Sequence, residues 1–509
     1  MPARAVWLAA ALVAALALPL GLGQPYWQEN DDAGMAMVAE GYGITAAPSP
    51  ALIFASVPYG ALVQAVGNYG LLMYAWLVLS AMAAAYALWR TGVAAPLGAA
   101  ALIAVFAPAA LYPQFTSVAG LAAIAAVLLL LADTRVPAVI CAAALLIVAA
   151  LLRAEAAAFA LLLTFPLWIG ARSVRMAAAG AVFLIAAASA FLADRAYYGA
   201  PEWAQFSEMN KARLAFTDYG LRQYFFRYPL DPMRLAWTPN DLVMVEGWFF
   251  ADPRVFPAKR VAELASQIYI DDFVVSNAYR YDEALAPFRN EALLALTVLA
   301  LFLAWRARSR AAAWTLGLIA AAMVAFWLAG RPGVGRIYYA PLAGAVLLTV
   351  SRVAAGWRDT AFAALVVLAA GVVLAARNVT DRREEVEARS ALCTLPADRL
   401  YVVWGNQLPF EKLYRPLAAR GDGCALRIYP LAVQAYAPYA LEQLRTFTGE
   451  GDVVAAILAG KELDMIAVGW QIDVLRRHLR IHYGRALQWR LLRGDGGRGT
   501  WFRVWIAPR

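Results

Sequence analysis

The sequence predicts an α-helical polytopic membrane protein of about 11 transmembrane helices that carries a C-terminal α/β soluble domain. Hydrophobic residues make up 63% of the 509 residues and charged residues only 16%. The mean hydropathy is +0.59. A soluble protein of this length would have to expose much of that apolar surface to water. The composition changes abruptly near residue 378, where a charged run begins and a water-exposed domain is expected.

Apolar segments follow one another through the first part of the chain. They lie at about 5–22, 70–89, 96–111, 115–132, 136–152, 156–171, 176–193, 291–305, 312–330, 337–350 and 360–376. Several are shorter than the roughly 20 residues of a full span. The first segment resembles a signal peptide, but 21–24 is a poor cleavage site and many apolar segments follow. We therefore expect an uncleaved first helix.

Arginine marks one end of the predicted bundle. If Met1 is cytoplasmic, every end expected inside carries arginine, as the positive-inside rule requires. These ends are Arg90, 133–135, 172–175, 306–310 and 352–358. The agreement requires that 51–67 lies at the outer interface and does not span, which Pro58, Gly60 and its short length favour. The net charge of +9 is then a topology signal, and no nucleic-acid partner is expected.

This topology predicts two units. Residues 1–377 form a transmembrane module with outer loops 23–69 and 194–290, and residues 378–509 form an extracytoplasmic domain, periplasmic in a bacterium. In that domain 400–404, 426–429 and 465–468 are typical of strands, and 409–420, 439–448 and 471–482 of helices. The glycine-rich run 494–499 lacks the Lys-Ser/Thr of a phosphate loop and precedes a strand, so it predicts a hairpin turn.

Cysteines are few and unevenly placed. Cys393 and Cys424 fall in the C-terminal domain, and Cys141 falls in a membrane helix. An oxidising compartment would permit one disulfide between the first two. The sequence does not supply the geometry that decides whether it forms.

Three carboxylates follow the first helix directly, at Glu29, Asp31 and Asp32. Adjacent aspartates repel, so one of the two tends to have a raised pKa unless a cation lies between them. Such a pair can act as a general base or hold a divalent metal through oxygen ligands. It can equally be a solvated loop that caps the following helix. The residues alone leave both interpretations open.

The order of these features resembles the GT-C glycosyltransferases, a superfamily that includes protein mannosyltransferases, aminoarabinose transferases and arabinofuranosyltransferases. The acidic pair is followed by a helix, a Gly-Tyr-Gly turn at 41–43 and Pro-Ser-Pro-Ala-Leu at 48–52. Arg153-Ala154-Glu155 is similar to the Arg-Pro-Glu/Asp element of that family, with alanine in place of proline. The segment 331–341, Arg-Pro-Gly-Val-Gly-Arg-Ile-Tyr-Tyr-Ala-Pro, is similar to its Arg-Tyr-x-x-Pro element.

The resemblance implies roles for particular residues. Asp31 would be the catalytic base, and Asp32 would assist it or ligate a divalent metal such as Mg or Mn. Arg331, Arg336 and Tyr338 would bind the phosphate of a polyprenyl-phosphate sugar donor. Arg153, Glu155 and Glu29 would form a second tier of site residues. Without the resemblance, arginines at helix ends anchor lipid headgroups, and Arg153 with Glu155 forms a local ion pair.

The outer loop 194–290 contains an acidic and aromatic run at 240–252, which includes Asp241. Such side chains stack on sugar rings and bond their hydroxyls, so Asp241 is a further second-tier candidate. Aromatic helices resting on lipid headgroups have the same composition.

Together these features predict an inverting glycosyltransferase at the outer face of a bacterial inner membrane. The N-terminus would be cytoplasmic, the donor a polyprenyl-phosphate sugar and the acceptor a lipid or glycan. One alternative is an O-antigen ligase or polymerase, but both histidines, His478 and His482, lie in the tail, where neither could act as a membrane-loop base. A transporter is the other alternative, although no midplane acids or repeated halves are evident.

Overall fold

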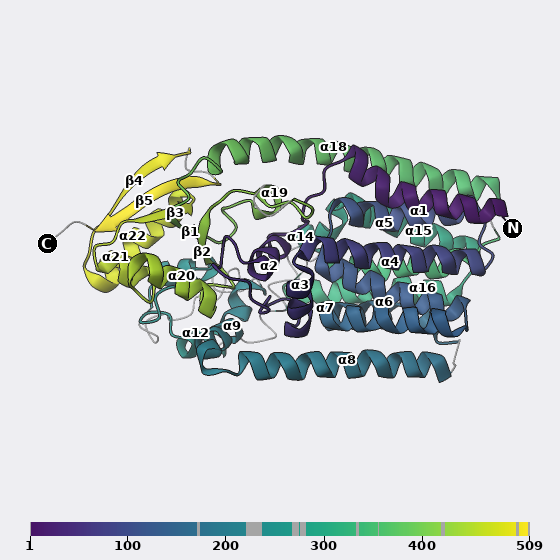
Figure 1. Ribbon diagram of the computed structural model, residues 1–509, viewed down its shortest axis with the longest axis horizontal. Helices are drawn as coiled ribbons and strands as arrows, with labels where there is room; N and C mark the ends of the chain where they lie inside the picture. The colour runs from purple at the N-terminus through teal and green to yellow at the C-terminus, as the bar shows by residue number, and fades with distance from the viewer. Residues whose placement is uncertain are drawn as a thin grey trace.

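The computed structural model describes residues 2–170, 174–219, 237–266, 274, 281–331, 335–354, 356–418, 423–494 and 498–506. Arg172, part of the loop 194–290, residues 332–334 and residues 495–497 therefore lie outside the described residues. A helical bundle occupies one end of the molecule and a small sheet with its helices the other (Figure 1). The predicted fold class, a polytopic helical membrane protein with a C-terminal α/β domain, is confirmed.

All eleven predicted apolar segments are helical. The bundle contains α1 (Pro2–Leu22), α4 (Tyr69–Arg90), α5 (Ala95–Leu111), α6 (Phe115–Ala132), α7 (Val136–Trp168), α8 (Val174–Tyr198), α15 (Glu291–Ala307), α16 (Arg310–Leu328), α17 (Arg336–Val350) and α18 (Trp357–Leu392). Within the described residues, seven helices are long and apolar enough to cross a membrane: α1, α4, α6, α7, α8, α16 and α18. The shorter α5, α15 and α17 account for three further predicted segments, and α7 contains two.

Helix α7 reverses direction at Arg153, whose backbone is non-helical (φ −164°, ψ 85°). Just before the break, the Leu151 carbonyl accepts a hydrogen bond from the amide of Ser56 in the first outer loop (3.1 Å). At the end of α7, the Leu167 carbonyl accepts one from Arg352, at the opposite end of the bundle. The two halves of α7 thus lie antiparallel, as the separate segments 136–152 and 156–171 predict.

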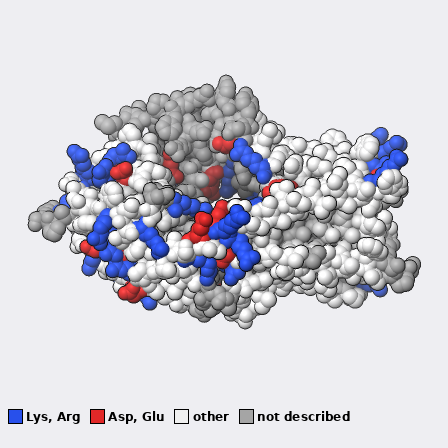
Figure 2. Space-filling model, turned by 90° about the horizontal axis from the view of Figure 1, so that it is seen from above, with Lys and Arg blue, Asp and Glu red and all other residues white. Residues whose placement is uncertain are grey.

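The described arginines of the helix ends gather where the predicted topology places the cytoplasm. Arg306 donates to Asp359 (2.9 Å) and so joins the end of α15 to the start of α18. Arg90 lies 3.9 Å from Asp133, between the ends of α4 and α6. Figure 2 shows Lys and Arg side chains at the far tip of the bundle, separated by a largely uncharged band from the charged C-terminal half. Charge at both ends of an apolar band is the pattern of a membrane-spanning unit.

The perimeter helices present apolar side chains outward. Only 17% of the apolar windows of α8, α16 and α18 is buried, whereas 89% of that of α6 is. Large side chains on α8 and α18 are about two-thirds exposed, namely Leu184, Ile185, Leu365 and Leu368. Such surface is unfavourable in water but matches hydrocarbon. Helix α6 is therefore the centre of the bundle, and α8, α16 and α18 face lipid.

Short elements cover the outer end of the bundle. They are α2 (Asn30–Glu40), α3 (Val57–Val66), η1 (Pro201–Trp203), α9 (Ala204–Thr217), α11 (Pro239–Glu246), α12 (Ala258–Ser266), α14 (Tyr281–Ala284) and η3 (Ala286–Arg289). Helix α3 has only 10 residues, so 51–67 does not span. Asp194 accepts from the amide of Val57 at its start (2.7 Å). A Cβ on Gly60 would lie 2.0 Å from the Pro50 carbonyl, so this packing requires glycine.

The C-terminal domain is a five-stranded mixed sheet with helices. Its elements are β1 (Leu400–Trp404), α19 (Phe410–Leu413), β2 (Arg427–Leu431), α20 (Pro438–Thr448), α21 (Val453–Leu458), β3 (Leu463–Ala467), α22 (Gly469–Tyr483), β4 (Leu487–Arg493) and β5 (Thr500–Ile506). The strand order is β2-β1-β3-β5-β4. Strand β1 pairs parallel with β2 and β3, and β5 pairs antiparallel with β3 and β4. Strands β1 and β3 are buried along their whole length, as parallel strands covered on both faces are.

The expected elements of this domain are largely present, with one difference. Strands β4 and β5 pair antiparallel on either side of the predicted turn 494–499, of which residues 495–497 lie outside the described residues. The helix predicted at 409–420 is wrong for most of its length, because among the described residues it ends at Leu413. Pro409 and Pro416 flank this stretch, and proline restricts the residue before it to extended backbone.

Helix α18 connects the two units without a break. It runs for 36 residues and continues past residue 378 to Leu392. Beyond the bundle it buries two carboxylates, each of which accepts a hydrogen bond from a tyrosine of the membrane unit. Tyr112 donates to Asp381 (2.5 Å), and Tyr26 donates to Glu385 (2.8 Å). The composition change near residue 378 thus marks the point where one helix leaves the apolar bundle.

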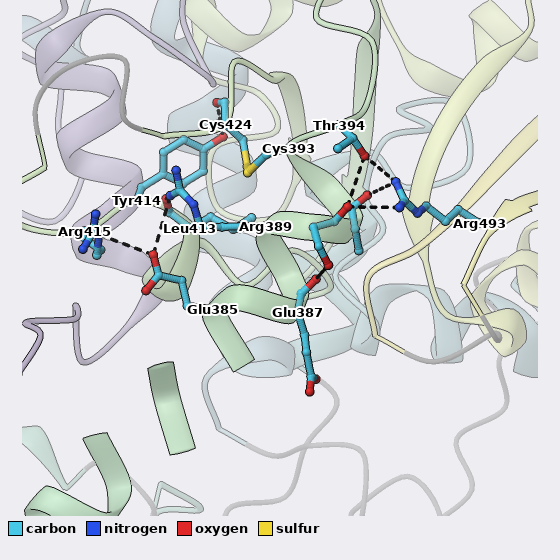
Figure 3. Close-up of a disulfide and its surroundings, with 12 residues drawn as sticks. Glu385, Glu387, Arg389, Cys393, Thr394, Leu413, Tyr414, Arg415, Cys424 and Arg493 are labelled. Atoms are coloured by element: carbon cyan, nitrogen blue, oxygen red, sulfur yellow. Dashed lines mark hydrogen bonds and ion pairs between the residues drawn. A yellow bond between two sulfur atoms is a disulfide. The ribbon is translucent and has the colours of Figure 1, made fainter. Parts of the chain in front are cut away.

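A disulfide joins Cys393, directly after α18, to Cys424, before β2 (Figure 3). Glu385 lies within 4 Å of both Arg389 and Arg415 in the same region. The Tyr414 hydroxyl donates to the Cys424 carbonyl (2.9 Å). Disulfides persist in oxidising compartments, so this bond agrees with an extracytoplasmic C-terminal domain.

Opening this disulfide should lower the stability of the C-terminal domain. The bond spans 31 residues of sequence, and a closed loop of that length contributes about 3–4 kcal/mol by restricting the unfolded chain. We expect Cys393→Ser to lower the thermal unfolding temperature in detergent by several degrees, as reductant does for the natural protein. Cys141→Ser is the matched control and should leave it unchanged. Equal melting of the Cys393 variant and the natural protein would contradict the prediction.

Candidate active site

The acidic run after α1 forms the start of α2. Glu29 is its N-cap residue, and Asp31 and Asp32 lie in its first turn. Carboxylates are favourable there because unpaired backbone N–H groups and the helix dipole make this end positive. The side chain of Glu29 makes no capping hydrogen bond to the helix. The alternative that the acids only cap the helix therefore lacks the side-chain bond expected of the N-cap residue.

Asp31 contacts a residue 305 positions away in sequence. Its Oδ2 accepts a hydrogen bond from Nη1 of Arg336 at 3.0 Å. The two side chains are 29% and 22% exposed, so water reaches both. Arg336 is the first residue of α17. The structure thus brings together the acidic run and the late arginine motif at the outer end of the bundle.

Asp32 is completely buried beside this exposed pair. Its Oδ1 accepts hydrogen bonds from the Tyr69 hydroxyl and the Phe115 amide, both at 3.0 Å. Its Oδ2 has no hydrogen-bond partner among the described residues. Burial, followed by the negative charge of Asp31, raises the pKa of Asp32 well above its usual range. At neutral pH this favours a proton on Asp32.

A buried arginine that the sequence analysis missed lies close to Asp31. Arg213, on α9, is 5% exposed, and its guanidinium stacks over Trp248 at 4.9 Å. Burial lowers its pKa to about 10, against the opposing attraction of Asp218 and Asp31. Its Nε has no hydrogen-bond partner among the described residues. No motif identifies this residue, because its helix is neither strongly apolar nor patterned.

Arg331 reaches the same group through Asp218. It donates to Asp218 Oδ2 at 3.1 Å, and Arg213 lies 3.5 Å from the other oxygen of that carboxylate. The Arg331 guanidinium also lies 5.2 Å from the ring centre of Tyr219. Asp218 therefore holds two arginines side by side. Arg336 thus pairs with Asp31 directly, Arg213 lies within electrostatic range of Asp31, and Arg331 joins the group through Asp218.

Tyr338 lies one turn into the bundle and is 1% exposed. Its ring packs against Phe159 and Phe326, at 6.4 Å and 6.2 Å between ring centres. Its hydroxyl has no hydrogen-bond partner among the described residues. A buried hydroxyl without a partner costs free energy. Tyr338 thus retains an unpaired hydroxyl two residues after Arg336, and its predicted role in donor binding stays a prediction.

Arg153 lies on the other side of Phe115. Its Nη1 donates to the Phe54 carbonyl at 2.7 Å, and its guanidinium lies 5.8 Å from the Phe115 ring centre. Its Nε is 3.4 Å from Glu155, whose side chain is 77% exposed. The local ion pair of the simpler interpretation is therefore present. Arg153 also supports Phe115, whose amide binds Asp32.

Asp241 is not part of this group. It is completely buried and contacts Thr238, His478 and His482. A buried carboxylate held by these groups has no surface for a sugar ring. Glu29, in contrast, lies at the start of α2 within electrostatic range of Arg336 and Asp31.

The acidic pair does not gather the ligands of a metal ion. Asp31 is paired with Arg336, and Asp32 offers one unpartnered oxygen. Among the described residues, one group of three or more His, Cys, Asp or Glu side chains brings its ligand atoms close together, and it contains neither residue. The predicted Mg or Mn at Asp32 stays a prediction.

A cavity of about 490 Å³ lies at the opposite end of α2. Glu40 and Tyr42 line it from the first outer loop, and Arg415, Arg427 and Gln443 from the C-terminal domain. Glu40 and Asp31 are nine residues apart on one helix, about 14 Å at the helical rise. The cavity is therefore a separate feature, connected to the acidic site through α2.

No protein-family model and no curated protein sequence matches the chain. A search of solved structures finds similarity to ArnT from Cupriavidus metallidurans bound to undecaprenyl phosphate. The two sequences are 15% identical, and the match covers 98% of this chain and 97% of that chain with a TM-score of 0.36. At this identity and TM-score, no residue role is transferred from that protein to this chain.

Replacing Asp32 by asparagine should change how stability depends on pH. An acid whose pKa is raised by folding stabilises the protein below about pH 4, and this contribution is lost as pH rises through the folded pKa. Asparagine does not titrate, and the fixed cost of burying its amide is the same at every pH. The stability of Asp32→Asn relative to the natural protein should therefore rise above pH 4, by up to about 1.4 kcal/mol per unit of pKa shift.

Thermal unfolding in detergent between pH 4 and pH 8 measures this difference. Asp473→Asn is the matched control, since Asp473 lies half-exposed on α22 beside Arg476. A stability difference for the Asp32 variant that stays constant over this range would show that Asp32 has an ordinary pKa.

Proposed function

We propose that this protein is an inverting glycosyltransferase of the GT-C type, which transfers a sugar from a polyprenyl-phosphate donor to a lipid or glycan acceptor. The observation that carries the proposal is the pairing of Asp31 with Arg336, beside Arg213 and Arg331, where the apolar bundle meets the polar domain. A lipid-linked donor has its tail in hydrocarbon and its phosphate at the interface. The junction of the apolar bundle and the polar domain suits both the tail and the phosphate of such a donor.

The two aspartates suit different tasks in such a reaction. Asp31 is accessible and paired with Arg336, so it can meet an acceptor hydroxyl and accept its proton. Asp32 is buried, its pKa is raised, and it is fixed by Tyr69 and Phe115. Asp31 is therefore the proposed base and Asp32 a positioning residue.

The chemical step balances with these groups alone. The acceptor hydroxyl loses its proton to Asp31, and its oxygen bonds to the anomeric carbon of the sugar. The bond from that carbon to the phosphate oxygen breaks with its electron pair, and polyprenyl phosphate leaves. Attack opposite the leaving oxygen inverts the anomeric centre. Arg336, with Arg213 and Arg331, stabilises the negative charge that develops on the departing phosphate.

The proposed orientation follows from charge and redox chemistry. The arginine-bearing end of the bundle would face the cytoplasm of a bacterial cell. The Cys393–Cys424 disulfide lies in the domain at the other end of the molecule, where an oxidising compartment would preserve it. The acidic site would then work at the outer face of the inner membrane.

Asp31→Asn should abolish transfer and leave folding intact, because the side chain is partly exposed and the change is nearly isosteric. Removing a general base costs about 100- to 10,000-fold in rate. The assay is release of polyprenyl phosphate from a panel of polyprenyl-phosphate hexoses and pentoses in proteoliposomes, with membrane lipid extract as acceptor and product masses recorded. Asp473→Asn controls for the same chemical change at a surface site. Undiminished transfer by the Asp31 variant would refute the proposed base.

Arg336→Gln should weaken transition-state stabilisation of the leaving phosphate. Loss of a hydrogen bond to a charged group costs about 1.5–3 kcal/mol, so we expect kcat/KM for the donor to fall about 10- to 100-fold. Arg213→Lys should also lower kcat/KM, since an ammonium group cannot reproduce the stacked guanidinium. Arg476→Gln, on the surface of α22, is the control. Unchanged kcat/KM for the donor in both variants would show that Arg336 and Arg213 do not act on the donor.

A further inference from the structure

Both histidines of the chain project from one face of α22. His478 and His482 are four residues apart, which places them on successive turns of the same side. Their ring centres are 4.7 Å apart. His478 is completely buried and His482 is 16% exposed. This spacing on a helix is a recurrent arrangement for two metal-binding imidazoles.

A carboxylate from the membrane unit completes the cluster. Asp241 Oδ1 lies 3.2 Å from His478 Nδ1 and 2.9 Å from His482 Nε2. One ligand atom from each of the three side chains lies within 4.8 Å of the others. The backbone amide and hydroxyl of Thr238 both donate to Asp241 Oδ2, at 2.7 Å and 2.8 Å. Thr238 thus fixes the carboxylate with Oδ1 toward the histidines.

A second carboxylate sets the orientation of the buried ring. His478 Nε2 lies 2.8 Å from Asp252 Oδ2. Tyr483 donates to Asp252 (2.7 Å), and Arg254 lies 3.1 Å from its other oxygen. When His478 is neutral and its Nε2 donates to Asp252, the lone pair of Nδ1 points at an oxygen of Asp241. Two acceptors 3.2 Å apart require a cation between them, either a second proton or a metal ion.

We propose that Asp241, His478 and His482 bind a zinc-class divalent ion, with Asp252 as a positioning residue for His478. Two imidazoles and one carboxylate suit zinc, whereas magnesium prefers oxygen ligands alone. Zinc–ligand bonds of about 2.0–2.2 Å separate tetrahedral ligand atoms by about 3.4 Å, close to the distances of 3.2 Å and 2.9 Å from Asp241 Oδ1 to the two imidazoles. A carboxylate behind a metal-binding histidine is the usual outer support. The exposure of His482 leaves room for water as a fourth ligand.

This ion would join two parts of the protein. Asp241 belongs to α11, in the outer loop of the membrane unit, and the histidines belong to α22, in the C-terminal domain. The cluster is distinct from the Asp31 group, since the two have no residue in common. The proposal therefore does not depend on the proposed transferase activity.

The test measures metal binding by the full-length protein, purified in detergent without a polyhistidine tag. After dialysis against metal-free buffer, we expect one equivalent of zinc by mass spectrometry, or its restoration when zinc chloride is added. Zinc should also raise the unfolding temperature of the metal-free protein. His482→Ala and Asp241→Asn should each bind zinc at least 100-fold more weakly. Asp252→Asn should bind it about 10- to 100-fold more weakly.

Asp473→Asn, on the same helix, is the control and should bind zinc like the natural protein. Cobalt chloride tests the wild-type site without any substitution, because cobalt bound to nitrogen and oxygen in a tetrahedral site absorbs visible light more strongly than hydrated cobalt. Failure of the wild-type protein to bind zinc or to give this spectrum would overturn the proposal. Stoichiometric zinc in the His482 variant would do the same. Either result would assign the cation between His478 and Asp241 to a proton.

Discussion

The ion pair between Asp31 and Arg336 fixes the arrangement on which the candidate site depends. It connects the first turn of α2 with the first residue of α17, two elements far apart in sequence. Partly buried ion pairs stabilise proteins weakly, because desolvation offsets much of their attraction. The pair is therefore poorly explained by stability. Its position at the outer end of the bundle, beside two further arginines, is explained by binding an anion next to a base.

The two adjacent acids differ in burial, and this difference assigns them different roles. They follow one another in one helical turn, so their backbones have the same dipole environment, yet α2 directs Asp32 into the protein and leaves Asp31 accessible. Tyr69 contacts α2 near both of its ends and so fixes the orientation of the two acids. Its hydroxyl binds Asp32, and its amide donates to Glu40 at the other end of α2 (2.9 Å). The start of α4 thereby fixes the rotation of α2, which decides which acid can reach a substrate.

Most of the membrane fold could be predicted, because each apolar segment carries its own signal in length and hydropathy. Even the reversal at Arg153 follows from two separate apolar segments. The β4 and β5 strands were harder to predict, because β4 is largely exposed and its side chains do not alternate between buried and exposed positions. The disulfide depended on geometry that cysteine spacing does not contain.

The site could be predicted only where residues form a local motif. The acidic pair and the 331–341 segment each have a recognisable pattern, and the structure brings Asp31 and Arg336 together. Arg213 has no such pattern, because its importance comes from burial against Trp248. The spacing of His478 and His482 was visible in the sequence. Its meaning was not, because the third member of the cluster is 237 residues from His478.

The two clusters are mechanically connected through α11. This helix is held at its start by Thr238 and Asp241, and directly after its end Trp404 donates to the Gly247 carbonyl (2.6 Å). Trp248 follows with φ 69°, a conformation that a bulky residue adopts only when its surroundings impose it. That conformation places its ring over Arg213. An ion at Asp241 would therefore help to hold an arginine of the acidic site through α11 and Trp248. An effect of chelators on sugar transfer would then not identify Asp32 as a metal ligand, because the histidine cluster could transmit it.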